Sequence, residues 1–215
     1  MFANEWLTIL AVAGLLCAAW AYYFFRTGVP TFPSMPVARD KIIALLRADM
    51  KAQPADRPYV IYDLGSGSGQ LSWHVARAIP EAKVIGIELS FTPWLRSVIW
   101  QKLSGQQNLR YLRVSFWEHD VSDASAVLTY LMEAIMPRVS AKLRRELRPE
   151  TLVISNKFIL PGWQLQEELP LQSAFTKRLW VYRHRFAAAP TVTPLPDVDD
   201  GDISEAAGDA STRAA

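Results

Sequence analysis

The chain has 215 residues, half of them hydrophobic, which suffices for one globular domain with extensions. Its formal net charge of +2 is too small for a nucleic-acid-binding surface, so no nucleic acid partner is expected. The single Cys excludes an internal disulfide, and no Cys or His pair has the spacing of metal ligands, so we expect no metal site.

The chain begins with a strongly apolar segment. Over residues 6–25 only Thr8 and Gly14 interrupt the hydrophobic run, and about 20 such residues are needed to span the hydrocarbon core of a bilayer. Trp and Tyr lie at its ends, where membrane interfaces favour them. A signal peptide or a buried core helix is the alternative, but no positive n-region precedes the run and it is apolar on all sides. We therefore expect residues 1–26 to form a transmembrane anchor.

The charges that flank this segment predict its orientation. Only Glu5 precedes the run closely, whereas basic residues follow it: Arg26, Arg39, Lys41 and Arg47. Because the positively charged side of a membrane protein stays in the cytoplasm, the rest of the chain should face the cytoplasm. The expected location is a bacterial inner membrane, with a mitochondrial membrane as the alternative.

The middle of the chain alternates between helical and strand patterns. Hydrophobic periodicity predicts helices over residues 37–50, 71–79, 93–103 and 132–147. Short β-rich runs predict strands over residues 59–62, 83–87, 109–116, 126–130, 151–155 and 179–182, with another near 164–169. This alternation is typical of a Rossmann-like α/β domain with a parallel sheet, which we expect over residues 27–186.

Two charged or polar stretches lie outside the apolar pattern. The last predicted helix, 132–147, has a set of basic residues that we expect on its outer face: Arg138, Lys142, Arg144, Arg145 and Arg148. Residues 187–215 are rich in Ala, Pro and Asp and show no hydrophobic period, which predicts a disordered acidic tail.

A glycine-rich loop directly follows the first predicted strand. It reads Asp63-Leu64-Gly65-Ser66-Gly67-Ser68-Gly69, and its glycines allow a ligand to approach the backbone closely. Asp63 is placed to accept hydrogen bonds from the amino group of a methionine moiety. Glu88 ends the next strand, where its carboxylate can hold both ribose hydroxyls. Ligands bind at the carboxyl ends of such strands, so this pattern predicts S-adenosylmethionine (SAM) as the cofactor.

A dinucleotide is the alternative ligand for a glycine loop. Its fingerprint is G-x-G-x-x-G, whereas this loop has G-x-G-x-G with Asp63 two residues before the first glycine. A carboxylate there would repel a pyrophosphate but attract an ammonium group. A Walker loop is excluded, because no Gly-Lys-Ser/Thr follows.

Several segments besides the loop resemble one branch of the class I SAM-dependent methyltransferases. This branch contains the small protein-lysine methyltransferases of adenine nucleotide translocase and the ATP synthase c subunit, with archaeal and bacterial relatives. The resemblance covers roughly residues 28–163. The segments that carry it are Pro33-Ser34, the glycine loop, Gly86-Ile87-Glu88-Leu89-Ser90 with Pro93-Trp94-Leu95, Phe116-Trp117, residues 142–147 and residues 158–163.

The sequence departs from this family at three places. Ser115 stands where the family usually has an Asp on the adenine side, and Ser68 replaces the second acid of the glycine loop. Residues 130–133 replace an aromatic-Gly-x-Pro segment that faces the substrate. Together, loop and resemblance imply these cofactor-binding residues: Asp63, Gly65, Ser66, Gly67, Gly69, Glu88, Leu89, Ser115, Phe116 and Trp117.

The resemblance implies methyl transfer to lysine, which needs a neutral amine in line with the methyl group. Desolvation and aromatic walls lower the pKa of a lysine, and Tyr130 and Trp117 could form such walls. Glu133 could orient the incoming ammonium or help to remove its proton. Ordinary packing for Tyr130, and a helix-dipole acid for Glu133, are the alternatives.

These observations predict a membrane-anchored SAM-dependent methyltransferase that modifies lysine on a protein, and we expect this protein at the same membrane. Two alternatives share the fold: an enzyme acting on a small or lipid-like molecule, and a non-catalytic adaptor with a weakened cofactor site.

Overall fold

The computed structural model describes residues 36–54, 56–172 and 177–186, together with residues 8, 11, 12, 14 and 15. The predicted tail and nearly all of the predicted anchor, residues 6–25, lie outside these residues. Within the described part, no helix combines the length and apolar character needed to cross a bilayer. The anchor and the domain boundaries therefore stay predictions.

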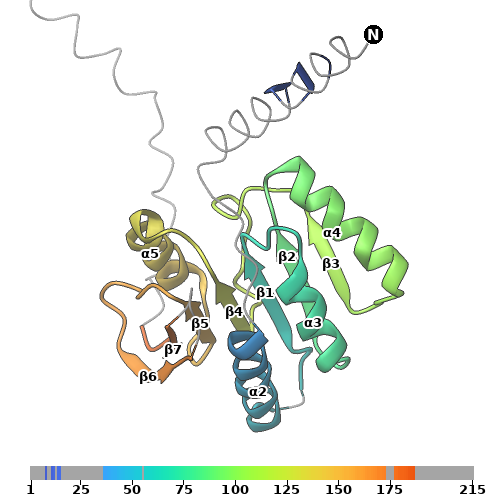
Figure 1. Cartoon of the computed structure of the whole chain (residues 1–215). Helices are drawn as coiled ribbons and strands as arrows, with labels where there is room; N and C mark the ends of the chain where they lie inside the picture. The colour runs from blue at the N-terminus through green and yellow to red at the C-terminus, as the bar shows by residue number, and fades with distance from the viewer. Residues whose placement is uncertain are drawn as a thin grey trace, which may run out of the picture.

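In the described part of the chain, one seven-stranded sheet forms the centre of the domain (Figure 1). Its strand order is β3-β2-β1-β4-β5-β7-β6. The strands are β1 (Val60–Leu64), β2 (Lys83–Ile87), β3 (Leu109–Leu112), β4 (Ala126–Thr129), β5 (Leu152–Asn156), β6 (Leu165–Pro170) and β7 (Arg178–Arg183).

The sheet is parallel over five strands but not throughout. Strands β1 to β5 pair in parallel, as the alternating pattern predicts. The prediction of a parallel sheet is wrong for β7, which runs antiparallel between β5 and β6. The connection between β6 and β7 is too short for a helical crossover, so these two strands pair antiparallel.

Helices cover both faces of the sheet. They are α2 (Pro36–Ala52), α3 (Gln70–Ala78), α4 (Phe91–Ser104) and α5 (Met136–Glu146), with a 3₁₀ turn, η1 (Glu133–Ile135), before α5. α2 and α3 pack on one face through Ile42, Leu46 and Val75, and α5 packs on the other through Val139 and Leu143. Because both faces are covered, β1 is buried along its whole length, and all its residues except Asp63 are apolar or aromatic.

The chain runs outward from β1 in both directions. β2 and β3 follow on one side, and β4 and β5 on the other. The strand order therefore reverses between the parallel strands β1 and β4. Such a reversal creates a crevice at the carboxyl ends of the two strands, where open α/β sheets bind ligands. The glycine loop starts at this edge, directly after Leu64.

The structure corrects two features of the predicted helix 132–147. The α-helix begins only at Met136, because Pro137 in its first turn fixes a helix start and residues 133–135 form a 3₁₀ turn. Lys142 is also not on an outer basic face. Its side chain is buried, and its Nζ donates to the backbone oxygen of His119 at 2.8 Å and pairs with Glu146. A buried cation needs such partners.

Candidate functional site

Backbone hydrogen bonds to the end of β2 hold the glycine loop in place. The backbone N–H groups of Gly65 and Ser66 both donate to the carbonyl oxygen of Ile87, each at 2.9 Å. Gly65, Gly67 and Gly69 have φ angles of 72°, 57° and 76°, in the left-handed region that favours glycine. The alternating glycines are therefore a requirement of the turn itself.

At two positions of the loop, Gly65 and Gly69, neighbouring side chains leave no room for a Cβ atom. A Cβ atom on Gly69 would lie 2.4 Å from the ring of Tyr111, and one on Gly65 would lie 2.7 Å from Cδ2 of Leu131. The hydroxyl of Tyr111 donates to the Gly69 carbonyl at 2.6 Å. These contacts, within the protein, fix the backbone whose amide groups line the crevice.

Glu88 connects the loop to the start of α4. Its Oε2 accepts the backbone N–H of Gly67 at 3.0 Å, and its Oε1 accepts the backbone N–H of Ser90 at 2.7 Å. The side chain is buried, so the carboxylate is fixed at the carboxyl end of β2. Each carboxylate oxygen retains a lone pair that can accept a further hydrogen bond from a ligand hydroxyl.

Asp63 lies on β1, beside the same edge. It is buried, and its Oδ2 accepts the hydroxyl of Ser72 at 2.5 Å. Burial, and to a lesser degree the negative charge of Glu88, raises its pKa to about 6, although the Ser72 hydrogen bond acts in the opposite direction. No ion pair among the described residues involves Asp63 or Glu88, and two such buried carboxylates favour the binding of a positively charged group.

The residues after β3 form a turn. Residues 113–116, predicted as strand, leave the sheet because the backbone N–H groups of Glu118 and His119 both donate to the carbonyl oxygen of Ser115 at 3.1 Å. The Ser115 hydroxyl oxygen accepts the backbone N–H of Trp117 at 3.3 Å. Phe116 and Trp117 lie with ring centroids 4.4 Å apart. Both rings are half-buried and pack against the hydrophobic cluster between the sheet and α5.

The structure gives Trp117 an additional neighbour. The guanidinium carbon of Arg138, on α5, lies 4.1 Å from the Trp117 ring centroid. One face of this ring is therefore already covered by a cation. If Trp117 contacts a ligand, it does so through its other face or its edge.

The remaining predicted site residues differ in their exposure. Tyr130 follows β4 and is half-buried at the carboxyl edge, whereas Glu133 is exposed in η1. Leu89 follows Glu88 but is 63% exposed, so it belongs to the rim of the crevice. The structure thus brings Asp63, Glu88 and the loop together and leaves Glu133 and Leu89 facing solvent.

Three polar side chains at this edge are buried without a partner in the described part of the chain, and only one of them, Ser66, was predicted from the sequence. Ser66 Oγ, Thr129 Oγ1 and both polar atoms of the Asn156 side chain are buried and find no hydrogen-bond partner among the described residues. Thr129 and Asn156 end β4 and β5, which are neighbouring strands. Unpaired buried polar groups are costly, so they indicate a ligand that supplies the missing partners. A polar residue ending an otherwise apolar strand is the only sequence signal for them.

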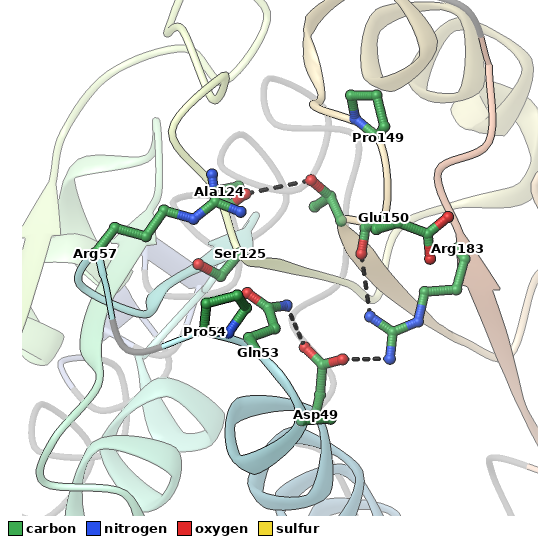
Figure 2. Close-up of a pocket in the computed structure, with 11 residues that line it drawn as sticks. Asp49, Gln53, Pro54, Arg57, Ala124, Ser125, Pro149, Glu150 and Arg183 are labelled. Carbon is green, nitrogen blue, oxygen red and sulfur yellow. Dashed lines mark hydrogen bonds and ion pairs between the residues drawn. The ribbon is translucent and has the colours of Figure 1, made fainter.

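A cavity among the described residues lies at the opposite edge of the sheet. It has a volume of about 330 Å³ and lies between the end of α2 and the amino ends of β1, β4 and β5 (Figure 2). Figure 2 shows Arg183 reaching toward Asp49 and Glu150: it pairs with the Asp49 carboxylate and donates to the Glu150 carbonyl at 3.0 Å. Gln53 donates to the same carboxylate at 2.9 Å. This network joins α2 to β7 and has a structural role.

Comparison with known families identifies a matching domain. Residues 63–167 match the model of the ANTKMT methyltransferase domain. A protein-lysine N-methyltransferase of Saccharolobus islandicus is 26% identical over 147 residues, which are 67% of this chain and 88% of that protein. The mouse adenine nucleotide translocase lysine N-methyltransferase is 29% identical over 163 residues, which are 73% of this chain. The match covers 64% of the mouse protein, a little under two thirds.

Solved structures share the same fold. An RNA methyltransferase from Salinibacter ruber, in complex with S-adenosyl-L-homocysteine, superposes with a TM-score of 0.64 at 22% identity, covering 74% of this chain and 97% of that one. The putative methyltransferase YhhF of Escherichia coli gives a TM-score of 0.56 at 16% identity, covering 73% and 89%. At these identities the likeness extends to the fold alone.

Proposed function

We propose that this chain, a SAM-dependent methyltransferase with an ANTKMT-type methyltransferase domain, transfers methyl groups to lysine side chains of a protein at a membrane. The observation that carries the lysine assignment is the match of residues 63–167 to this domain. Relatives that are named lysine N-methyltransferases support it.

The residues at the carboxyl edge fit SAM. The buried carboxylate of Asp63 would hold the amino group of the methionine moiety, and Glu88 would accept the ribose hydroxyls while it retains the Gly67 N–H. The turn after β3, with Ser115, Phe116 and Trp117, would enclose the adenine. When bound, SAM supplies an electrophilic methyl group on a positively charged sulfur, which attracts a nitrogen lone pair.

The acceptor amine would enter at the carboxyl ends of β4 and β5. A lysine amine must lose its proton before its lone pair can form the new N–C bond as the S–C bond breaks. Exclusion of water by Tyr130 and Trp117 would disfavour the ammonium form, and the Arg138 cation on Trp117 would act in the same direction. The unpaired Asn156 side-chain oxygen is available to accept an N–H of the amine and orient its lone pair.

Glu133 fits a peripheral role better than a catalytic one. It is exposed in η1, where its carboxylate can meet an approaching ammonium group before the amine reaches the site. Its contribution would then be to the capture of the substrate lysine. The chemical step would depend on Tyr130 and on the groups of the crevice.

Membrane attachment through residues 1–26 would explain the apolar run over residues 6–25. Tethering confines the enzyme and a membrane-protein substrate to the same surface, which raises the effective concentration of one for the other. The proposal includes a catalytic domain on the cytoplasmic side, where SAM is supplied, with residues 27–186 as that domain and 187–215 as its tail.

The test is transfer of an isotope-labelled methyl group from SAM by the full chain to components of its own membrane. After the reaction, protein is separated from lipid by solvent extraction. The proposal expects label in protein, and loss of most of it with Asp63→Asn. An exposed carboxylate far from the crevice, replaced in Glu81→Gln, is the matched control that should retain activity. Label confined to the lipid phase would reject a protein substrate and favour a lipid-like acceptor.

A further inference from the structure

α4 is apolar on its outward side as well as on the side that packs on the sheet. Toward the sheet, Pro93 and Ser97 are buried, and Trp94 and Val98 pack against the core. Large hydrophobic side chains point away from the sheet, with Phe91, Leu95, Ile99 and Leu103 repeating every four residues. They are 52%, 38%, 48% and 75% exposed. A four-residue spacing places side chains on one face of a helix, so these residues form a continuous stripe.

Other exposed apolar residues extend this stripe. Trp100 is 56% exposed and lies beside it on α4, and Leu89 precedes the helix. Val114 lies next to Arg113, whose guanidinium carbon is 5.2 Å from the Phe91 ring centroid. We call these seven residues the α4 surface: Leu89, Phe91, Leu95, Ile99, Trp100, Leu103 and Val114. A soluble helix normally shows its polar side to water, so an apolar surface of this kind indicates a partner.

The position of α4 leaves this surface accessible in the described part of the chain. α4 packs on β3, which is the edge strand of the sheet (Figure 1). Figure 1 shows no described helix or strand beyond α4 on that side. The surface therefore borders the outside of the domain.

The charges around the surface are of one sign. Between Glu88 and Glu118 the sequence contains no acidic residue. Four exposed basic residues lie in this interval: Arg96, Lys102, Arg110 and Arg113. Arg96 and Lys102 lie on α4 itself, next to the apolar stripe. The α4 surface is thus large, apolar and bordered by cations.

We propose that the α4 surface docks on the interface of an anionic lipid bilayer, with α4 lying in the plane of the membrane. A helix of this type buries its apolar face at the headgroup boundary, while basic side chains meet anionic lipid. Phe91 and Trp100 have the aromatic rings that interfaces favour. A protein partner would not require the complete absence of acidic residues, whereas an anionic surface selects for it.

Docking through α4 would also orient the crevice. Leu89 is adjacent to Glu88, and Val114 is adjacent to Ser115, so the α4 surface reaches the rim of the carboxyl edge. A lysine close to the headgroups would then lie near the opening of the site. This consequence rests on the proposed function, whereas the docking itself depends only on the surface.

The test places a fluorophore on α4 in the full chain. Cys17→Ser removes the only native thiol, and Leu103→Cys then carries an environment-sensitive dye. The protein is reconstituted in vesicles of phosphatidylcholine and phosphatidylglycerol that contain a lipid-borne nitroxide quencher. Docking predicts a blue-shifted emission that the nitroxide quenches at least about twofold, as expected for a group at the headgroup boundary. Arg148→Cys, exposed after α5 on the other face of the sheet, is the matched position that should remain unquenched.

Two results would overturn the proposal. Emission at position 103 equal to that of position 148 would mean that water covers the stripe. A blue shift without quenching would mean that protein covers it, either a second copy or another segment of this chain. SAM affinity of each labelled protein, measured in parallel, checks that the domain is folded and keeps a failure of the proposed function separate from a failure of docking.

A charge variant tests the lipid chemistry. Arg96→Gln with Lys102→Gln should shift the docking equilibrium toward the undocked state on the order of tenfold, because each basic residue near an anionic leaflet contributes to the attraction. Lys51→Gln with Arg148→Gln removes two exposed charges elsewhere and should leave quenching unchanged. Equal quenching for both double variants would contradict a role for anionic lipid.

Discussion

The backbone N–H of Gly67 donates to Oε2 of Glu88 at 3.0 Å, and this bond ties the loop after β1 to the end of β2. The other carboxylate oxygen of Glu88 accepts the N–H of Ser90 at the start of α4. One buried side chain therefore fixes the turn that forms the crevice and the helix beside it. Any ligand that uses Glu88 also meets a preorganised loop.

Replacement of Glu88 should weaken SAM binding more than it weakens the fold. Glu88→Gln keeps the size of the side chain but removes its charge and one acceptor. A hydrogen bond to a charged group contributes about 1.5–3 kcal/mol, so we expect a Kd for SAM about 10 to 100 times higher by calorimetry. Glu118→Gln, at an exposed position, is the control. A Kd within twofold of the wild type in Glu88→Gln would place the ribose elsewhere.

The loop glycines should differ in how strictly they are required. Gly69 and Gly105 both have a positive φ, 76° and 66°, but only Gly69 has a neighbour in the path of a Cβ atom. Gly105→Ala should cost about 1 kcal/mol of the free energy of unfolding, from backbone strain alone. Gly69→Ala should cost about 1–3 kcal/mol more, because the Tyr111 ring must move. Urea denaturation of both variants measures the difference, and equal losses would show that the Tyr111 contact does not constrain the loop.

SAM affinity should depend on pH through Asp63. Its pKa is raised to about 6, so below that pH the carboxyl binds a proton and loses its attraction for an ammonium group. We expect the affinity to fall up to about tenfold per pH unit below pH 6 and to level off above it. Asp63→Asn should bind weakly at every pH and show a flat profile. Calorimetry between about pH 5 and pH 8 provides the measurement.

The stability of the ligand-free protein should change with pH in the opposite direction. The folded-state pKa of Asp63 lies above its ordinary value of 3.8, so the folded state binds the proton more tightly than the unfolded state does. This group therefore adds stability as the pH falls from about 6 to about 4. The contribution of Asp63 is the difference between the pH profiles of the free energy of unfolding of the wild type and of Asp63→Asn. A difference that decreases as the pH falls would contradict the raised pKa.

Asn156 should matter for activity and not for stability. Its buried side chain makes no hydrogen bond to described residues, so Asn156→Leu should leave the free energy of unfolding unchanged or raise it by up to about 1 kcal/mol. If Asn156 orients the acceptor amine, the same variant should lower kcat at least about tenfold with the Kd for SAM unchanged.

Asn108 provides the contrast. The two N–H groups of its Nδ2 are shared among the carbonyl oxygens of Ala76, Ile79 and Ala82, which lie 2.9–3.1 Å from the nitrogen. Asn108→Leu should therefore cost about 2 kcal/mol of stability and leave kcat per folded molecule unchanged. A stability loss of the same size in Asn156→Leu would mean that Asn156 has a structural role.

Local sequence signals predict most helices and strands of this fold. They are strongest where an element is long or where turn residues mark its ends. β2 has the predicted bounds, whereas β1 runs two residues further than predicted because Asp63 and Leu64 continue the pairing with β2. The antiparallel direction of β7 was not predicted, because a run of apolar residues does not indicate whether its strand is parallel or antiparallel to its neighbours. Lys142 was misplaced because the backbone oxygen of His119, which its Nζ contacts, is 23 residues away in the sequence and becomes a neighbour only in the folded domain.

The candidate site divides in the same way. The loop, Asp63 and Glu88 follow a spacing that the sequence displays directly, and the structure places them at one edge. Thr129 and Asn156 carry no motif, and their significance is visible only from burial and the missing partners. The apolar stripe of α4 has the ordinary period of a core helix, so the sequence alone does not reveal that it points away from the sheet.

The most direct measurement of the central claim is the chemical identity of the methylated group. Protein labelled by the full chain with methyl-labelled SAM is hydrolysed to amino acids, and the label is located by chromatography against methyllysine standards. The account predicts label in mono-, di- or trimethyllysine, and its loss with Asp63→Asn. Label on another amino acid, or none in protein while lipid is labelled, would contradict it.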